Sequence, residues 1–389
     1  MRNELISAYN NKGLKETAGA FCVADPPFSY DGTGLRCDGE MLPNGDIVFR
    51  YPAEPGHSIS LTLGFGGESI ELSDRGNGYY EGVLSYNSDR SGSIRIQFFV
   101  DGVRVLNPYL PIMSGHISEN ILEIPDLNHD FILLKDVPHG TVAREIFWSE
   151  TIGDWARCLI YIPAEYWNTE KKYPVLYVQN GGGGNETDWM YGMNLPYMMD
   201  NILEAGECKP FLVVANDGNL RIPGDNKSDD FAGIEGILTK DCRQFIESRY
   251  RVYTDKWNRG LAGFSLGGMT TSWVGFRHPE LYGYLGLFSG SIRRMDNHNT
   301  FEDSPHLEIL KHPELVEKSY RLIWRSKGTL ELAKRGPTGK LQSTEDTEWM
   351  AQFGTDQVAC HQWHDIPNKG HNYSCWRAAF KEFAPLLFV

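Results

Sequence analysis

Residues 259–268 read RGLAGFSLGG, which places Ser265 at the centre of a Gly-x-Ser-x-Gly pattern. The apolar run Arg259–Phe264 before the serine predicts a buried strand, and the run from Leu266 to His278 predicts a helix. A serine on a tight strand-to-helix turn exposes its hydroxyl at the carboxyl end of a sheet, where the first N–H groups of the helix can stabilise an oxyanion. The alternative is a Gly-rich loop with a serine of no function, but the strand and helix context favours Ser265 as a nucleophile.

The chain after about Leu127 repeats this alternation of strands and helices. Further strands are expected at residues 143–149, 157–162, 173–178, 211–216, 284–289, 320–325 and 359–365. Helices are expected near residues 195–206, 230–251, 345–354 and 374–386. Together with the strand before Ser265, the alternation predicts a central, mostly parallel, eight-stranded sheet covered by helices. The polar segment 290–318 is expected to be irregular and to form part of a pocket wall.

A serine nucleophile needs a general base, and His371 is the best-placed histidine. It lies in the loop Asn368–Asn372, after the last expected strand and before the final expected helix. Such a loop returns to the strand ends where Ser265 is expected. His361 and His364 fall inside the strand-like run, where packing or surface exposure is the better interpretation. The sequence therefore predicts His371 as the base.

The acid that orients this histidine is expected after the strand 320–325. Glu331 is the first acidic side chain in the loop that follows. Asp303, Glu345 and Asp346 are rivals, and Glu331 also fits a favourable charge in the first turn of a helix. We predict that Glu331 accepts the imidazole N–H and stabilises the imidazolium.

An oxyanion hole requires two backbone N–H donors. The first is expected at Leu266, directly after the nucleophile. The second is expected in the glycine run 181–184 after the third strand, from Gly181 or Gly182, because glycine lets the backbone approach a substrate oxygen closely. A phosphate-binding loop is the alternative for this run, but no Gly-Lys-Ser/Thr follows it.

The part of the chain before residue 127 has a different pattern of apolar and turn residues. Short alternating runs such as Ser58–Leu63 and Ser93–Val100 are separated by turn residues about every 8 to 12 positions, the spacing typical of an all-β sandwich. We expect an N-terminal extension at residues 1–24, an immunoglobulin-like β-sandwich at 25–126 and the catalytic domain at 127–389.

Composition and charge exclude several classes of partner. The 389 residues include 51 acidic and 37 basic side chains, a net charge of −14, which argues against nucleic acid or an anionic membrane. No apolar stretch is long enough for a membrane span, and the N-terminus lacks the pattern of a signal peptide. Seven scattered cysteines without a Cys-x-x-Cys pair argue against a zinc site or a disulfide framework and favour a reducing compartment. We expect a cytoplasmic protein, or a secreted one if a signal peptide has been removed.

Several motifs taken together resemble a known family. They are residues 173–177 leading into the glycine run, 185–189, 259–268, 370–372 and 376–377. On these motifs, the chain from His139 to Phe388 resembles the esterase D and feruloyl-esterase type of α/β-hydrolase, carbohydrate esterase family 1. Two positions depart from the family pattern. Asn180 stands where a histidine is common, and Glu331 stands where aspartate is usual. The stretch Asp101–Pro108 resembles the immunoglobulin-like module that precedes such esterases, which is similar to family-48 carbohydrate-binding domains.

The resemblance implies an α/β-hydrolase fold and a serine esterase that releases hydroxycinnamate, such as ferulate, from plant cell-wall oligosaccharides. Relatives deacetylate xylan, hydrolyse siderophore esters or transfer mycolyl groups. An apolar slot with aromatic walls suits a cinnamoyl ring, although core packing explains a single aromatic residue equally well. The candidates for this slot are Trp189, Phe264, Trp376 and Tyr191.

No metal or organic cofactor is expected, because serine, histidine and acid complete the chemistry. The expected partner is a small-molecule or oligosaccharide ester, and a homodimer is compatible with the sequence. A carbohydrate-binding protein with a silent hydrolase domain is the alternative from another class, and it would bind xylo-oligosaccharides without turning over any ester. The presence of both Ser265 and His371 in context favours the enzyme.

Overall fold

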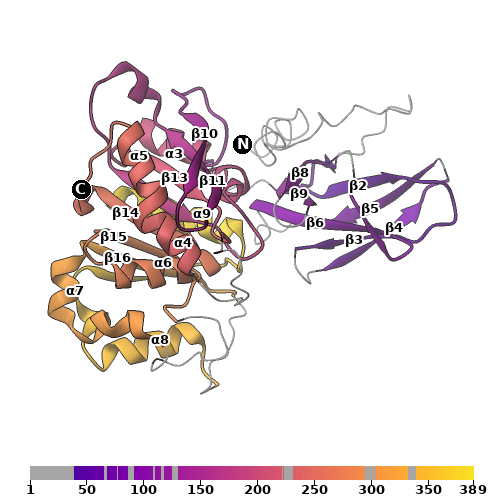
Figure 1. Ribbon diagram of the computed structural model, residues 1–389. Helices are drawn as coiled ribbons and strands as arrows, with labels where there is room; N and C mark the ends of the chain where they lie inside the picture. Colours follow the sequence, from indigo (N-terminus) through magenta and orange to yellow (C-terminus); the bar gives the residue numbers. More distant parts are fainter. Residues whose placement is uncertain are drawn as a thin grey trace. The chain divides into compact units, whose positions relative to one another are not determined.

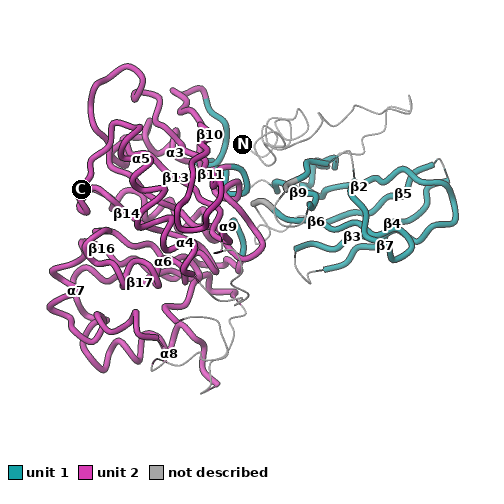
Figure 2. Tube along the Cα trace, viewed as in Figure 1, with its two compact units in different colours: residues 1–135, 191–194, 372–374 teal, residues 136–190, 195–371, 375–389 magenta. Residues whose placement is uncertain are grey.

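The computed structural model describes residues 39–389 except 65–67, 77, 86–91, 108–109, 115–117, 125–129, 221, 223–230, 294–300, 302–303 and 332–338. The chain divides into two compact units (Figure 2). The first comprises residues 1–135, 191–194 and 372–374, and the second comprises 136–190, 195–371 and 375–389. The expected N-terminal extension and the expected boundary at residues 126 and 127 lie outside the described residues.

The first unit is built from antiparallel strands, as predicted for this part of the chain. Their order in the sheet is β1-β2-β5-β4-β3-β6-β9-β8, with β7 paired to β6. The bounds are β1 Glu40–Met41, β2 Ile47–Pro52, β3 Ile59–Leu63, β4 Ser69–Asp74, β5 Tyr79–Leu84, β6 Gly92–Val100, β7 Val103–Val105, β8 Ile112–Ser114 and β9 Ser118–Ile124.

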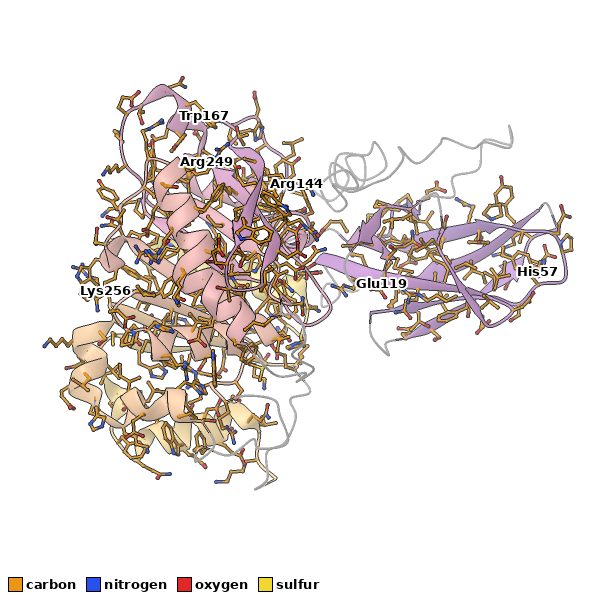
Figure 3. All side chains as sticks on the ribbon, in the orientation of Figure 1. His57, Glu119, Arg144, Trp167, Arg249 and Lys256 are labelled. Atoms are coloured by element: carbon orange, nitrogen blue, oxygen red, sulfur yellow. The ribbon has the colours of Figure 1, made fainter. Side chains whose placement is uncertain are left out.

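Alternation of side chains explains how these strands form a core. Along β3 every second residue is buried, which is the period of a strand with one face inward. Leu61 lies opposite Phe98 of β6, and both side chains are fully buried. A buried carboxylate also occurs here: Glu119 of β9 accepts hydrogen bonds from Gln97 at 2.6 Å and Arg104 at 3.2 Å (Figure 3). Its charge is therefore compensated.

The second unit contains the predicted eight-stranded sheet, in the order β10-β11-β13-β12-β14-β15-β16-β17 (Figure 1). The pairs β10–β11 and β11–β13 are antiparallel, and every later pair is parallel. The bounds are β10 Thr141–Ser149, β11 Asp154–Ile162, β12 Val175–Gln179, β13 Leu212–Asn216, β14 Arg259–Phe264, β15 Tyr284–Phe288, β16 Leu322–Gly328 and β17 His361–Ile366.

Helices cover this sheet and share a large apolar core with it. Helix α6 contacts β14 and β15, and Arg249 of α5 binds Glu145 of β10 at 2.9 Å (Figure 3). The α-helices are α3 Leu195–Glu204, α4 Ala232–Gly236, α5 Cys242–Arg249, α6 Leu266–Arg277, α7 Pro313–Ser319, α8 Gln342–Ala351 and α9 Tyr373–Phe383. The 3-10 and π helices are η2 Ala164–Asn168, η3 Asp188–Gly192, η4 Ile237–Asp241, η5 Lys256–Asn258, η6 Pro305–Lys311, η7 Thr355–Gln357 and η8 Ala384–Leu386.

The fold class is confirmed, and one local expectation is wrong. The segment 290–318, expected to be irregular, contains η6 and α7. Both helices begin with a proline at the first helical position, where the missing N–H costs no hydrogen bond. Each buries a few apolar side chains, Leu307 and Leu310 in η6 and Val316 in α7, and this packing stabilises helices too short to be stable alone.

No helix in the described part of the chain is long and apolar enough to cross a membrane. Within the same residues, no group of three or more histidine, cysteine, aspartate or glutamate side chains could hold a metal ion. The described cysteines, Cys158, Cys208, Cys242, Cys360 and Cys375, are all free thiols.

Candidate active site

Ser265 lies on the turn between β14 and α6, as its sequence context predicts. Its backbone has φ 55° and ψ −120°, a conformation that L-residues rarely adopt. The N–H of Ser265 donates to the carbonyl of Phe288 at 2.8 Å, which holds the strained residue against the neighbouring strand β15. Strain of this kind persists only where the surrounding structure enforces it, and here it exposes the hydroxyl above the sheet.

The glycines around the serine are required by close backbone contacts. A Cβ atom on Gly267 would lie 2.3 Å from the carbonyl oxygen of Gln179 and 2.6 Å from that of Asn180. A Cβ atom on Gly263 would lie 2.3 Å from the backbone of Gly267. Real Cβ atoms do not approach backbone so closely, and backbone cannot move aside cheaply. The first turn of α6 therefore packs directly against the glycine-run loop.

The structure brings the three predicted polar side chains together. His371 Nε2 lies 2.9 Å from Ser265 Oγ, and His371 Nδ1 lies 2.9 Å from Glu331 Oε2. The Glu331 side chain is only 3% exposed, whereas that of His371 is 46% exposed. The imidazole is therefore open to a ligand while its carboxylate partner is shielded from water. This is the arrangement of a nucleophile, a base and an orienting acid.

Three donors converge on the carboxylate of Glu331. His371 bonds one oxygen, while the Ser289 hydroxyl and the Gly328 N–H, at 2.8 Å, donate to the other. Burial by itself would raise the pKa of Glu331, but the hydrogen bond and charge of His371, with the bonds from Ser289 and Gly328, lower it below its usual value. Glu331 is therefore ionised at neutral pH and can stabilise a positive imidazole.

Ser289 is a functional candidate that the sequence alone did not reveal. It follows β15 with a positive φ of 53°, and its hydroxyl accepts a 2.9 Å hydrogen bond from the indole N–H of Trp376 while donating to Glu331. The ring of Trp376 also meets the ring of His371 edge to face, with centroids 5.2 Å apart. Trp376 thus positions the acid and the base together. A serine one residue beyond a strand end carries no motif, so no local signal could have identified it.

The glycine run is held in place by Asn180, at the position where a histidine is common in the resembled family. Its amide donates to the carbonyl of Gly181 at 2.8 Å, and its oxygen accepts from the N–H of Gly218 at 2.7 Å. The N–H of Gly184 also donates to the Gly181 carbonyl. Because a trans peptide is planar, the N–H of Gly182 points away from these donors.

Leu266 begins α6, and the N–H groups of a first helical turn have no acceptor within the helix. A Cβ atom on Gly182 would lie 3.9 Å from the Leu266 side chain, so the two loops are neighbours. The assignment of Leu266, with Gly181 or Gly182, to an oxyanion hole stays a prediction.

Three of the four aromatic pocket candidates form one packed group. Phe264 stacks on Trp376 with centroids 4.2 Å apart and 9° between ring planes, and Trp189 packs on Phe264 at 5.3 Å. Trp189 is fully buried, and its N–H donates to the carbonyl of Gln179. Its surface is therefore covered by residues of the core. Contact of these rings with an acyl group stays a prediction, and Trp376 is the one placed beside His371. Tyr191 belongs to the segment 191–194 of the other unit.

Two of the three rival acids are accounted for by other contacts. Asp303 lies outside the described residues. Glu345 and Asp346 are buried and bind Arg293 at 2.9 Å and 2.8 Å, and Asp346 also accepts from Ser291. These contacts tie α8 to the loop after β15 and leave Glu331 as the acid at His371.

Residues 149–387 match the family described as putative esterase. The chain belongs to this family. It is 34% identical over 259 residues to an endo-1,4-beta-xylanase/feruloyl esterase of Xylanibacter ruminicola, covering 63% of this chain and 35% of that protein. It is 30% identical over 145 residues to endo-1,4-beta-xylanase Y of Acetivibrio thermocellus, covering 34% of this chain and 12% of that protein. The esterase thus spans about a third or less of the length of these relatives.

Solved structures of esterases share the fold. A carbohydrate esterase family 1 ferulic acid esterase from Anaeromyces mucronatus superposes with a TM-score of 0.54 at 21% identity, covering 66% of this chain and 93% of that one. The enterobactin esterase of Shigella flexneri superposes with a TM-score of 0.60 at 15% identity, covering 88% and 92%. The predicted resemblance to carbohydrate esterase family 1 is confirmed, and the second unit has the fold of these esterases. The likeness of the N-terminal strands to a family-48 module stays a prediction, because the family match begins at residue 149.

Proposed function

We propose that the protein is a serine esterase that releases hydroxycinnamate, of the ferulate type, from plant cell-wall oligosaccharides through an acyl-enzyme. The observation that carries this proposal is the continuous hydrogen-bonded chain from Ser265 through His371 to the buried Glu331, with 2.9 Å at each step to the imidazole. Membership of the esterase family and the identity to a protein named as a xylanase/feruloyl esterase support the reaction and the acyl group.

Acylation begins with attack of Ser265 Oγ on the ester carbonyl carbon. The hydroxyl proton passes to His371 Nε2, which is within hydrogen-bonding distance. The carbonyl oxygen becomes an oxyanion held by the N–H groups of Leu266 and of Gly181 or Gly182. When the tetrahedral intermediate collapses, the bond to the sugar oxygen breaks, and His371 returns the proton to that oxygen. Hydroxycinnamate is then esterified to Ser265.

Deacylation repeats these steps with water. His371 removes a proton from the water as it attacks the acyl carbon, and then returns the proton to Ser265 Oγ as the free acid leaves. Glu331 stays ionised throughout, because its pKa is lowered by the donors around it. It stabilises the imidazolium in both halves of the cycle, and neither half requires a metal ion.

The test is a panel of esters with the acyl group as the variable. Methyl ferulate, acetylated xylan and a catecholate siderophore ester are compared by kcat/KM. The proposal predicts the highest value for methyl ferulate and loss of all activity in Ser265→Ala. A higher value for acetylated xylan or for the siderophore ester would move the assignment to those activities within the same fold.

A silent carbohydrate-binding protein is the competing function. It predicts binding of xylo-oligosaccharides with no turnover of any ester by the wild type. Release of ferulate by the wild type at a rate that Ser265→Ala abolishes would exclude it. Full activity of Ser265→Ala on every ester would refute the nucleophile instead.

A further inference from the structure

A cavity of about 680 Å³ lies next to the acid loop in the second unit. Gly328, Thr329 and Glu331 form one end of it, and α8, η7 and β17 form its other walls. The volume is within the range of sites for small ligands, about 300 to 1,000 Å³. The mechanism above does not use this cavity, although Glu331 links it to His371.

The floor of the cavity is one face of the two strands at the edge of the sheet. Lys327 of β16 lies opposite Asp365 of β17, and Arg325 lies opposite Trp363. Residues two apart on a strand share a face, so His361, Trp363 and Asp365 form one row along β17. This row extends over about 13 Å at the usual rise of a strand. It leads from His361 toward the strand ends where the triad lies.

Trp363 offers a flat aromatic face to the cavity. The guanidinium of Arg325, a residue that is only 1% exposed, lies over its ring at 5.0 Å from the centroid. Trp363 itself is 36% exposed, and because one face is against a buried residue, the exposed surface is on the other side. The indole N–H donates to Asp365 at 3.0 Å, which fixes the plane of the ring. The platform is therefore held rigid before any ligand arrives.

Two acceptors in the lining have no hydrogen-bond partner among the described residues: His361 Nε2 and Asp356 Oδ1, both shielded from solvent. The other nitrogen of His361, Nδ1, lies 3.2 Å from the backbone carbonyl of Asp356, which can only accept. Nδ1 therefore carries the proton. Burial and the nearby Arg325 lower the pKa of His361 to about 4, so the ring is neutral and Nε2 is an acceptor. Because both atoms are shielded from water, neither is open to a ligand hydroxyl in the cavity.

The charges of the lining restrict the ligand further. Besides Glu331, the described lining includes Glu348, Asp356 and Asp365, against a single lysine, Lys327. A surplus of carboxylates disfavours an anion and favours a neutral molecule that is rich in hydroxyl groups. A saccharide ring has an apolar face for an aromatic platform and hydroxyl donors around its edge.

We propose that this cavity is a subsite for the neutral saccharide chain that carries the ester, with Trp363 as the stacking platform and Asp365 as a hydroxyl acceptor. This proposal rests on the proposed function, which identifies the saccharide chain. It places the sugar beyond the acid loop, next to Glu331. Recognition of the saccharide is then separate from recognition of the acyl group.

The first test measures binding without any ester. Xylotriose is titrated into the wild type, Trp363→Ala and Trp363→Phe by calorimetry, with trigalacturonate as the anionic comparison. We expect Kd for xylotriose to rise about tenfold in Trp363→Ala, which corresponds to ~1.4 kcal/mol of lost stacking, and to recover in Trp363→Phe. Trp148→Ala is the matched control, because Trp148 is 46% exposed but lies on β10, at the opposite edge of the sheet.

The second test measures selectivity. The ratio of KM for a feruloylated xylo-oligosaccharide to KM for methyl ferulate should rise about tenfold in Trp363→Ala and stay constant in Trp148→Ala. The proposal is overturned if the wild type does not bind xylotriose, if Trp363→Ala binds it as well as the wild type does, or if both esters lose activity equally. Binding of xylotriose through Trp363 without release of ferulate would refute the proposed acyl group and leave the subsite standing.

Discussion

Replacement of Glu331 by glutamine tests whether this carboxylate supplies the charge that the histidine needs. The change keeps the size of the side chain and removes its negative charge. In the structure the carboxylate is 2.9 Å from His371 Nδ1 and only 3% exposed, so water screens it little. Three donors point at it, from His371, Ser289 and Gly328, and an amide cannot accept from all of them.

The size of the effect follows from the geometry. Opposite unit charges about 4 Å apart in an effective dielectric of about 20 attract by roughly 4 kcal/mol. That attraction exists only when the imidazole is protonated, as it is in the transition state, so its loss raises the barrier. Each 1.36 kcal/mol is a factor of about ten in rate, which predicts a fall in kcat of about a thousandfold with little change in KM.

The assay is steady-state hydrolysis of whichever ester the wild type cleaves fastest, so the outcome does not depend on the identity of the acyl group. Glu308→Gln is the matched control, because the Glu308 side chain is 64% exposed and removal of its charge should leave kcat unchanged. Circular dichroism and thermal unfolding establish that Glu331→Gln folds. A loss of kcat smaller than tenfold in a folded variant would refute the role given to Glu331.

Three further changes address the surroundings of the triad. Ser289→Ala removes a hydrogen bond to an ionised carboxylate, worth about 1.5 to 3 kcal/mol, so kcat should fall about 10- to 100-fold at constant KM; unchanged kinetics would contradict a positioning role. Asn180→Ala releases the Gly181 carbonyl and the Gly218 N–H, and kcat should fall about tenfold because the amides of the glycine run lose their orientation; a change in KM alone would argue against this. His361 has a lowered pKa of about 4 in the folded chain against 6.5, so the unfolded chain binds the proton first as pH falls. The free energy of unfolding should therefore fall by about 3 kcal/mol between pH 6.5 and 4 through this group. Urea titrations of His361→Gln should show a correspondingly shallower pH dependence than those of the wild type. Parallel curves for the two proteins would contradict a lowered pKa of His361.

Where local sequence patterns predict an element, the structure agrees closely with the prediction. The strand before Ser265 has the predicted bounds, Arg259–Phe264, and the helix after it begins at the predicted Leu266. Periodicity and apolar runs are local properties, and they are strong where a strand is buried on both faces. The pattern fails in the segment 290–318, where short helices are stabilised by tertiary packing rather than by their own sequence.

Some residues of the candidate site also follow from the sequence, and others are shown only by the structure. Ser265 and His371 were identified because each lies in a loop whose place in the fold follows from the element order. Glu331 is also the acid that the sequence predicts, from its place after the strand, but only the structure shows that Glu345 and Asp346 form ion pairs with Arg293 instead. The sequence does not single out the row of residues on β17, because its histidines fit packed or surface positions and their surroundings are formed by α8 and η7.

The sequence by itself determined the turn that holds Ser265, because glycines, a buried strand and a following helix are encoded within ten residues. Only the tertiary structure brings the base and the acid to that serine. His371 is 106 residues from Ser265 and 40 from Glu331 along the chain, and Ser289 is 42 from Glu331. Contacts over such separations depend on the order of strands in the sheet, and that order is the outcome of packing all the elements together rather than a property of any one segment.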